Sequence, residues 1–127
     1  MSVPTDPFAD ALAQQAAAAA QGFDWDDAQG LWDKLAEEIA ELRAAGDAAH
    51  RAEELGDLLF MIVNIARHLG LDPAAALAGA NAKFRRRYGH VAAALDRLPP
   101  LGDPRRIAAM EARWQEAKAL ERQAPPA

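Results

Sequence analysis

Apolar and polar residues follow a helical period along most of the chain. Between Leu31 and Leu42, apolar side chains recur at spacings of three and four, which is typical of an amphipathic helix. Aspartate, proline and glycine, which favour helix ends, divide the sequence into five such segments. Four of the predicted helices cover residues 6–22, 47–69, 72–98 and 103–122. The remaining one, second in chain order, runs from near residues 24–26 to residue 46.

These segments predict an all-α fold without a sheet, because alanine is the most frequent residue and β-branched residues are scarce. The connection at Gly46-Asp47 is short, so the second and third helices should pack antiparallel. We expect a helical bundle of four to five helices in one domain over residues 22–122. Residues 1–21 form an alanine-rich helix that we expect to be loosely docked and leave unassigned, and residues 123–127 a disordered tail.

The third predicted helix is apolar on nearly all sides between Leu55 and Ile65. A helix of this kind must be buried on nearly all sides, and the other helices of a small chain would struggle to cover it. We therefore favour a homodimer with a two-fold axis. The alternative is that the fifth helix wraps back and covers this surface.

Charge and composition narrow the possible functions. The 127 residues carry a net charge of −5, which argues against a nucleic-acid partner. Cysteine is absent, which excludes disulfides and thiolate chemistry. The N-terminus does not resemble a signal peptide, and the longest apolar run, residues 58–63, is too short to span a membrane. A cytoplasmic protein without a membrane partner is the expectation.

Two acidic pairs border the apolar stripes of the second and third helices. Glu38 and Glu41 are three residues apart, as are Glu54 and Asp57, so each pair shares a helix face. In an antiparallel pair these four carboxylates would converge, and two like charges 4 Å apart repel by about 4 kcal/mol at an effective dielectric constant of 20. No lysine or arginine lies at the matching positions, so we consider Mg²⁺ or Mn²⁺. The alternative is an ordinary solvated acidic face.

Basic and aromatic residues follow in the fourth and fifth helices. Lys83 and Arg87 share one helix face, and Trp114 and Lys118 share another. The first pair is either a phosphate clamp or a solvated basic face, and Trp114 either stacks on a nucleobase or packs in a core or dimer contact. Asn81 either binds a ligand or satisfies a buried backbone group. His68 suits the end of its helix, where nothing is expected to pair with it.

Several motifs together resemble the MazG nucleoside triphosphate pyrophosphohydrolases, a family of all-α nucleotide pyrophosphatases. The resemblance covers about residues 22–122, and its hallmark is E-E-x-x-E followed on the next helix by E-x-x-D. Many family members carry two such domains, and the single one here is similar to their C-terminal, catalytically competent domain. The matching stretches are G-F-D-W at 22–25, L-W-D-K-L-A-E-E-I-A-E-L at 31–42, E-E-L-G-D-L-L-F at 53–60, V-N-I-A-R-H-L-G at 63–70, A-N-A-K-F-R-R-R-Y at 80–88 and M-E-A-R-W-Q-E-A-K at 110–118.

The resemblance implies an enzyme that hydrolyses a nucleoside triphosphate to the monophosphate and pyrophosphate with Mg²⁺, in house-cleaning or control of nucleotide pools. It implies a homodimer or a larger even oligomer. The alternative function is a non-catalytic dimeric module that senses nucleotides or docks onto a protein. The resemblance assigns metal binding to Glu38, Glu41, Glu54 and Asp57, the candidate base to Glu37, the triphosphate to Lys83 and Arg87, and the substrate site to Trp114 and Lys118, with Asn81 as a further candidate.

Overall fold

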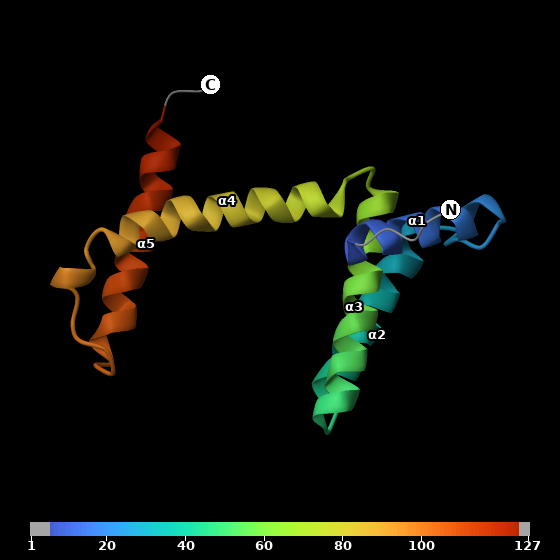
Figure 1. Cartoon of the computed structure of the whole chain (residues 1–127), viewed down its shortest axis with the longest axis horizontal. Coiled ribbons are helices and arrows are strands. Elements are labelled where there is room, and N and C mark those ends of the chain that lie inside the picture. The colour runs from blue at the N-terminus through green and yellow to red at the C-terminus, as the bar shows by residue number, and fades with distance from the viewer. Residues whose placement is uncertain (1–5, 125–127) are drawn as a thin grey trace. The chain divides into compact units, whose positions relative to one another are not determined.

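The structure is a computed structural model that describes residues 6–124, and every regular element in that range is helical (Figure 1). The prediction of an all-α fold is therefore confirmed. Of the tail predicted to be disordered, residues 125–127 lie outside the described range, as do residues 1–5 of the N-terminal segment. The elements are α1 (Pro7–Ala20), α2 (Ala28–Ala44), α3 (Ala48–His68), α4 (Pro73–Ala92), the 3₁₀ helix η1 (Leu95–Arg97) and α5 (Arg105–Gln123).

Aspartate side chains set the starts of the helices. Asp27 and Asp47 each accept a hydrogen bond of 2.8 Å, from Gly30 N and His50 N respectively, and so satisfy N–H groups left free by the first helical turn. Two predicted boundaries are wrong. The second helix begins at Ala28, later than expected, because Asp27 is its cap, and the fourth ends at Ala92, after which the chain turns into η1.

The chain forms two compact units that divide between Leu77 and Ala78. In the first unit, α2 and α3 lie side by side and antiparallel, as predicted, joined by the short turn after Ala44 (Figure 1). Their shared core consists of Leu31, Met61 and Ile65, with Leu35 packed against it. The antiparallel packing of α2 on α3 fixes the heights at which their polar residues meet.

The α1 helix is anchored on α3, although its alanine-rich sequence led us to expect loose docking. Ala11 and Gln15 are buried, and Gln15 Nε2 donates a 2.9 Å hydrogen bond to the carbonyl oxygen of Phe60. Alanine side chains supply little apolar area, so one buried amide makes the specific contact that positions this helix. Residues 7–20 are thus part of the first unit.

The α3 helix keeps part of its apolar surface exposed. Leu55, Leu59, Phe60 and Ile62 are each more than 40 % accessible. None of the described helices is by itself long and apolar enough to cross a bilayer; only α3 and α4 taken together reach that length and composition, and the chain bends sharply between them. Some of the apolar side chains that surround this helix in the sequence analysis are therefore exposed on the surface of the described structure.

The second unit contains the later part of α4, η1 and α5. Val91, Ala94 and Ala117 are its buried apolar residues within the described range. Arg113 Nη2 donates a 2.8 Å hydrogen bond to the carbonyl oxygen of His90 and so ties α5 to α4. The buried side chains of this unit are small. Much of its packing is therefore specified by polar and aromatic contacts.

Candidate functional site

Three carboxylates converge where α2 and α3 pack together. Glu38, Glu41 and Glu54 each place one carboxylate oxygen within 4.8 Å of the others. Glu38 and Glu41 lie one turn apart on α2, and the antiparallel packing brings Glu54 of α3 to their height. Asp57 lies one turn further along α3; it is exposed and lines a cavity together with Glu38. Spacing alone indicates this convergence, and three of the four carboxylates show it.

The buried oxygens of this acid cluster are only partly satisfied. Glu38 is 6 % exposed, and one oxygen each of Glu38 and Glu54, Oε2 in both, is buried without a hydrogen-bond partner among the described residues. Burying a carboxylate oxygen without a partner is costly. Such unpaired oxygens in a converging group are what a bound cation would satisfy.

Two basic side chains already contact the acid cluster, and the lysine among them corrects the expectation that no lysine or arginine is suitably placed. Lys34 Nζ lies 3.3 Å from Glu38 Oε1, and His50 Nε2 lies 3.2 Å from Glu54 Oε1. The pKa of Lys34 is raised, first by its hydrogen bond to Glu38 and then by the charge of Glu37. Both contacts join residues four apart on one helix, a spacing from which they could have been predicted.

The acid cluster has the chemistry of a site for a hard divalent cation. Carboxylate oxygens on two rigid helices suit Mg²⁺ or Mn²⁺ better than zinc. Lys34 and His50 each contact the Oε1 atom of a glutamate, so the buried Oε2 atoms are the ones left without a partner. The residues present therefore fit a divalent cation.

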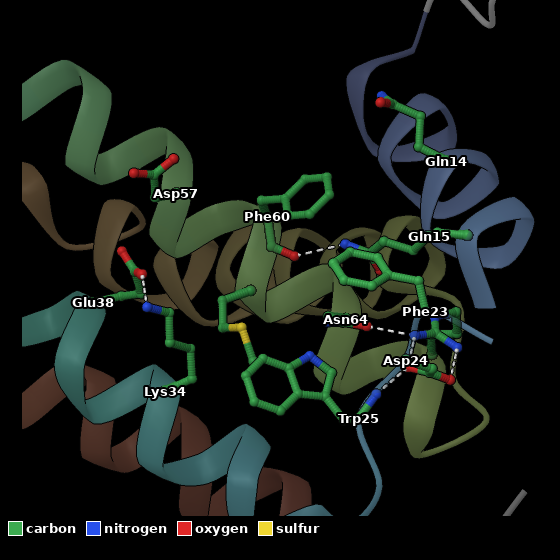
Figure 2. Close-up of a pocket in the computed structure, with 13 residues that line it drawn as sticks. Gln14, Gln15, Phe23, Asp24, Trp25, Lys34, Glu38, Asp57, Phe60 and Asn64 are labelled. Atoms are coloured by element: carbon green, nitrogen blue, oxygen red, sulfur yellow. Dashed lines mark hydrogen bonds and ion pairs between the residues drawn. The ribbon is translucent and has the colours of Figure 1, made fainter. Parts of the chain in front are cut away.

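A cavity of about 610 Å³ adjoins the acid cluster. Glu38, Lys34 and Asp57 lie at one end of it, and Phe23, Trp25 and Asn64 at the other (Figure 2). Trp25 lies close to α2 at Gly30, where a Cβ atom would come within 3.2 Å of Trp25 Cε3. A glycine at position 30 thus lets the indole ring lie against the helix and form part of the cavity wall.

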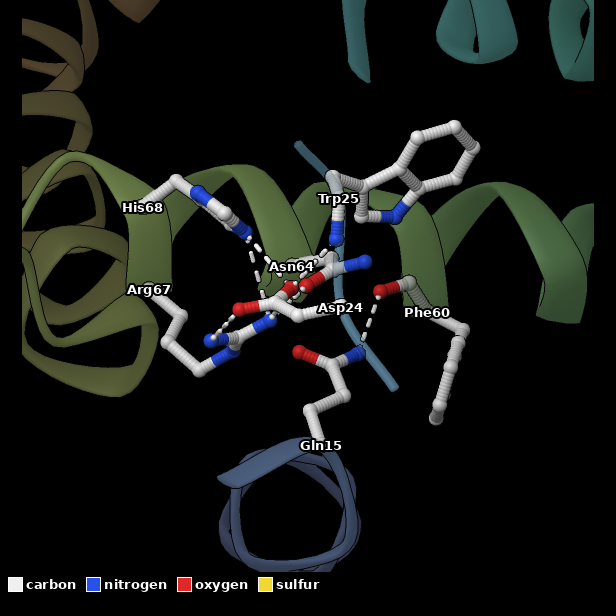
Figure 3. A network of polar contacts seen from close by, with 7 residues as sticks. All are labelled: Gln15, Asp24, Trp25, Phe60, Asn64, Arg67 and His68. Atoms are coloured by element: carbon white, nitrogen blue, oxygen red, sulfur yellow. Dashed lines mark hydrogen bonds and ion pairs between the residues drawn. The ribbon is translucent and has the colours of Figure 1, made fainter. Parts of the chain in front are cut away.

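Asp24 holds the turn after α1 against the end of α3. Its Oδ1 lies 2.7 Å from Arg67 Nη2 and 2.9 Å from His68 Nε2 (Figure 3). The expectation that nothing pairs with His68 is therefore wrong. The hydrogen bond from Arg67, followed by those from His68 and from the backbone of Trp25, holds the pKa of Asp24 well below its usual range. Neither Asp24 nor Gln15 was singled out as a site residue, because each acts through a partner more than 40 positions away.

The basic and aromatic candidates meet in the second unit. Arg87 Cζ lies 5.7 Å from the centroid of the Trp114 ring, and the Phe84 and Trp114 centroids are 5.5 Å apart. Arg87 also donates three hydrogen bonds to Glu121, including one of 2.9 Å from Nη2 to Oε2. Arg87 therefore already binds a carboxylate. Glu121, which the sequence analysis missed, contacts the guanidinium that was expected to bind a phosphate.

The remaining candidates are placed less specifically. Lys83 is exposed and Lys118 is partly buried. Asn81 is exposed and lines a smaller cavity with Phe84. Glu37 is exposed on α2, beside the buried Glu38, and lies outside the group of three converging carboxylates.

The fold and the acid cluster define the class: an all-α protein that offers oxygen ligands for a divalent cation on two antiparallel helices. The MazG nucleotide pyrophosphohydrolase domain matches residues 26–92. The chain belongs to this MazG domain family. The match covers α2, α3 and α4, and so includes all four predicted metal ligands.

Two curated relatives support this assignment. The chain is 38 % identical over 97 residues to the nucleoside triphosphate pyrophosphohydrolase/pyrophosphatase MazG of Thermotoga maritima, a match that covers 76 % of this chain and 38 % of that protein. It is 48 % identical over 75 residues to the nucleoside triphosphate pyrophosphohydrolase of Escherichia coli K12, covering 55 % of this chain and 28 % of that protein. The chain thus spans little more than a third of the length of the first relative and less than a third of the second.

Proposed function

We propose that the chain hydrolyses nucleoside triphosphates to nucleoside monophosphates and pyrophosphate with the help of a divalent cation. The convergence of Glu38, Glu41 and Glu54, with two buried oxygens left unpaired, carries this proposal. Membership of the MazG family and the activities for which two relatives are named agree with it. A module that only docks onto a protein would have no need for these costly unpaired oxygens, and a non-catalytic nucleotide sensor would bind the triphosphate without releasing pyrophosphate.

Glu38, Glu41, Glu54 and Asp57 are the proposed ligands of Mg²⁺, for which Mn²⁺ could substitute. Bound there, the cation would supply Lewis acidity and neutralise triphosphate charge. The position of Asp57 in the cavity that also contains Glu38 supports its inclusion. Lys34, which contacts Glu38, would limit the repulsion between the carboxylates whenever the cation is away.

The other site residues would bind and orient the substrate. In the proposed reaction, a water oxygen bonds to the α-phosphorus, the bond to the α–β bridging oxygen breaks, and pyrophosphate leaves. Glu37 is the proposed acceptor of the water proton. Lys83 and Arg87 would hold the charge that builds up on pyrophosphate, and Trp114, Lys118 and Asn81 complete the proposed substrate site.

We also propose that the chain assembles as a homodimer or a larger even oligomer. Leu55, Leu59 and Ile62 leave one apolar face of α3 exposed, and apolar surface of this kind favours burial against a second copy. Sedimentation at several protein concentrations would measure the subunit number directly. House-cleaning of abnormal nucleotides or control of nucleotide pools is the proposed cellular role.

The test is pyrophosphate release from a panel of triphosphates with and without Mg²⁺. We expect release with Mg²⁺ and its loss on adding EDTA. Glu54→Gln should lower the rate by roughly 10²-fold, because it removes charge at a converging oxygen while keeping the shape. Glu53→Gln, an exposed neighbour outside the acid cluster, is the matched control and should retain the rate. Equal rates in the two variants would refute the proposed metal site.

A further inference from the structure

The end of the cavity away from the acid cluster has walls suited to a flat aromatic ring. Phe23, Trp25, Phe60 and Met61 line it, and the Phe23 and Trp25 rings face the same space in Figure 2. Trp25 is 37 % exposed, so its indole can be covered by another ring. If the acid cluster binds the phosphates, as proposed above, this end is where the base of the same nucleotide would lie.

Asn64 presents a hydrogen-bond donor to this cavity. The residue is only 8 % exposed, and its Oδ1 accepts a 2.7 Å hydrogen bond from Arg67 Nη2. A guanidinium has only donors, so the amide oxygen must face Arg67 and the NH₂ group must point the other way. Within the described residues, the Asn64 Nδ2 atom donates to no partner and is not fully covered.

Trp25 adds a second donor, and the acceptors nearby are already occupied or covered, apart from the amide oxygen of Gln14, which also lines the cavity. The indole Nε1 can only donate, and it has no hydrogen-bond partner in the described part of the chain. The Phe60 carbonyl takes the Gln15 amide, Asp24 is held by Arg67 and His68, and Gln15 Oε1 is completely covered. What this end of the cavity offers to a ligand is therefore mainly N–H groups.

We propose that this cavity selects nucleobases with an oxo group at C4 of a pyrimidine or C6 of a purine, on the edge that faces Asn64 and Trp25: uracil, thymine, hypoxanthine and guanine. An oxo group accepts from these donors. The exocyclic amino group of cytosine or adenine would instead place donor against donor and leave both unpaired, and an unpaired buried polar group gives strong discrimination. The inference rests on the proposed function for the placement of the phosphates, and adds the class of base.

The first experiment compares nucleotides that differ at one exocyclic group. For the full-length chain in Mg²⁺ buffer, we expect kcat/KM for pyrophosphate release to be about tenfold higher for UTP than for CTP, and for ITP than for ATP. Calorimetric titration with the non-hydrolysable α,β-imido analogues of UTP and CTP should show a similar ratio of dissociation constants. Hydrolysis of all four triphosphates at equal efficiency would overturn this inference while leaving the proposed function intact. Absence of both hydrolysis and analogue binding would overturn both.

The second experiment exchanges the donor for an acceptor. Asn64→Asp keeps the oxygen that accepts from Arg67 and replaces the NH₂ group by an oxygen, so the fold should be retained. We expect the ratio of UTP to CTP efficiency to fall below one. Gln29→Glu, the same amide-to-acid change at an exposed position of α2 outside the cavity, should leave the ratio unchanged. An unchanged ratio in Asn64→Asp would show that Asn64 does not face the base.

Discussion

The two charged regions of the molecule differ in how far their charges are satisfied. In the acid cluster of α2 and α3, two buried carboxylate oxygens have no partner among the described residues. In the second unit, Arg87 is paired through three hydrogen bonds with Glu121 and lies over Trp114. Unpaired buried charge indicates a missing ligand, whereas a paired surface charge is stable as it stands. The first region is therefore the stronger candidate for an obligatory binding site.

The largest expected effect comes from changing the buried member of the acid cluster. Glu38→Gln replaces an oxygen by an NH₂ group at the least exposed of the three converging carboxylates. We expect kcat/KM for pyrophosphate release to fall roughly 10²-fold or more, because an amide cannot supply the charge.

The matched control for this variant is Asp33→Asn on the exposed side of α2. The new amide would keep an oxygen to accept from Gln29, as Asp33 does now at 2.9 Å. Its kcat/KM should remain within about a factor of two of the wild-type value. If Glu38→Gln retains the same kcat/KM as this control, the unpaired oxygens of the acid cluster do not contribute to catalysis.

A smaller effect is expected from freeing the paired arginine. Glu121→Gln removes the charge that competes with a phosphate for Arg87. An ion pair that stays partly accessible to solvent contributes little free energy, so we expect the KM for a triphosphate to decrease by about threefold at unchanged kcat. An increase in KM would instead mean that Glu121 orients Arg87 for the substrate.

The pH dependence of stability tests the same ion pair. The hydrogen bonds from Arg87 and then Arg86 lower the pKa of Glu121 from 4.5 to about 2. Because the pKa of Glu121 is lower in the folded state, its carboxylate stabilises the fold at pH values above the pKa of the unfolded state. This stabilisation is lost as the pH falls through the pKa of the folded state. The melting temperature of wild type should therefore exceed that of Glu121→Gln at pH 6, with a difference that shrinks by pH 3. A difference independent of pH would contradict the assigned pairing.

The smallest effect is expected at the cavity wall. In Gly30→Ala, the new Cβ atom would lie 3.2 Å from Trp25 Cε3, so the indole must shift by a few tenths of an ångström. Alanine is favoured over glycine within a helix by about 0.5–1 kcal/mol, which offsets the crowding. We expect an unchanged melting temperature with a changed tryptophan emission spectrum and a KM raised about twofold. An unaltered spectrum would mean that the ring does not rest on this helix.

The sequence predicted the helices and the acid cluster because both depend on local spacing. Glu38 and Glu41 share a face by periodicity, and the short turn after α2 brings Glu54 alongside them. Lys34 also follows from spacing and was overlooked. The contacts of Gln15 and Asp24 depend instead on where two distant helices meet, which no periodic pattern encodes. The arrangement of donors in the cavity could not be predicted for the same reason.

The role of Asp24 has a practical consequence for redesign. One carboxylate ties the turn that carries Phe23 and Trp25 to the end of α3. A mutant library intended to change which nucleotide enters can vary those two aromatic positions independently, because the tether stays in place. Randomising position 24 as well would shift both walls at once, and any altered selectivity could no longer be traced to a single side chain.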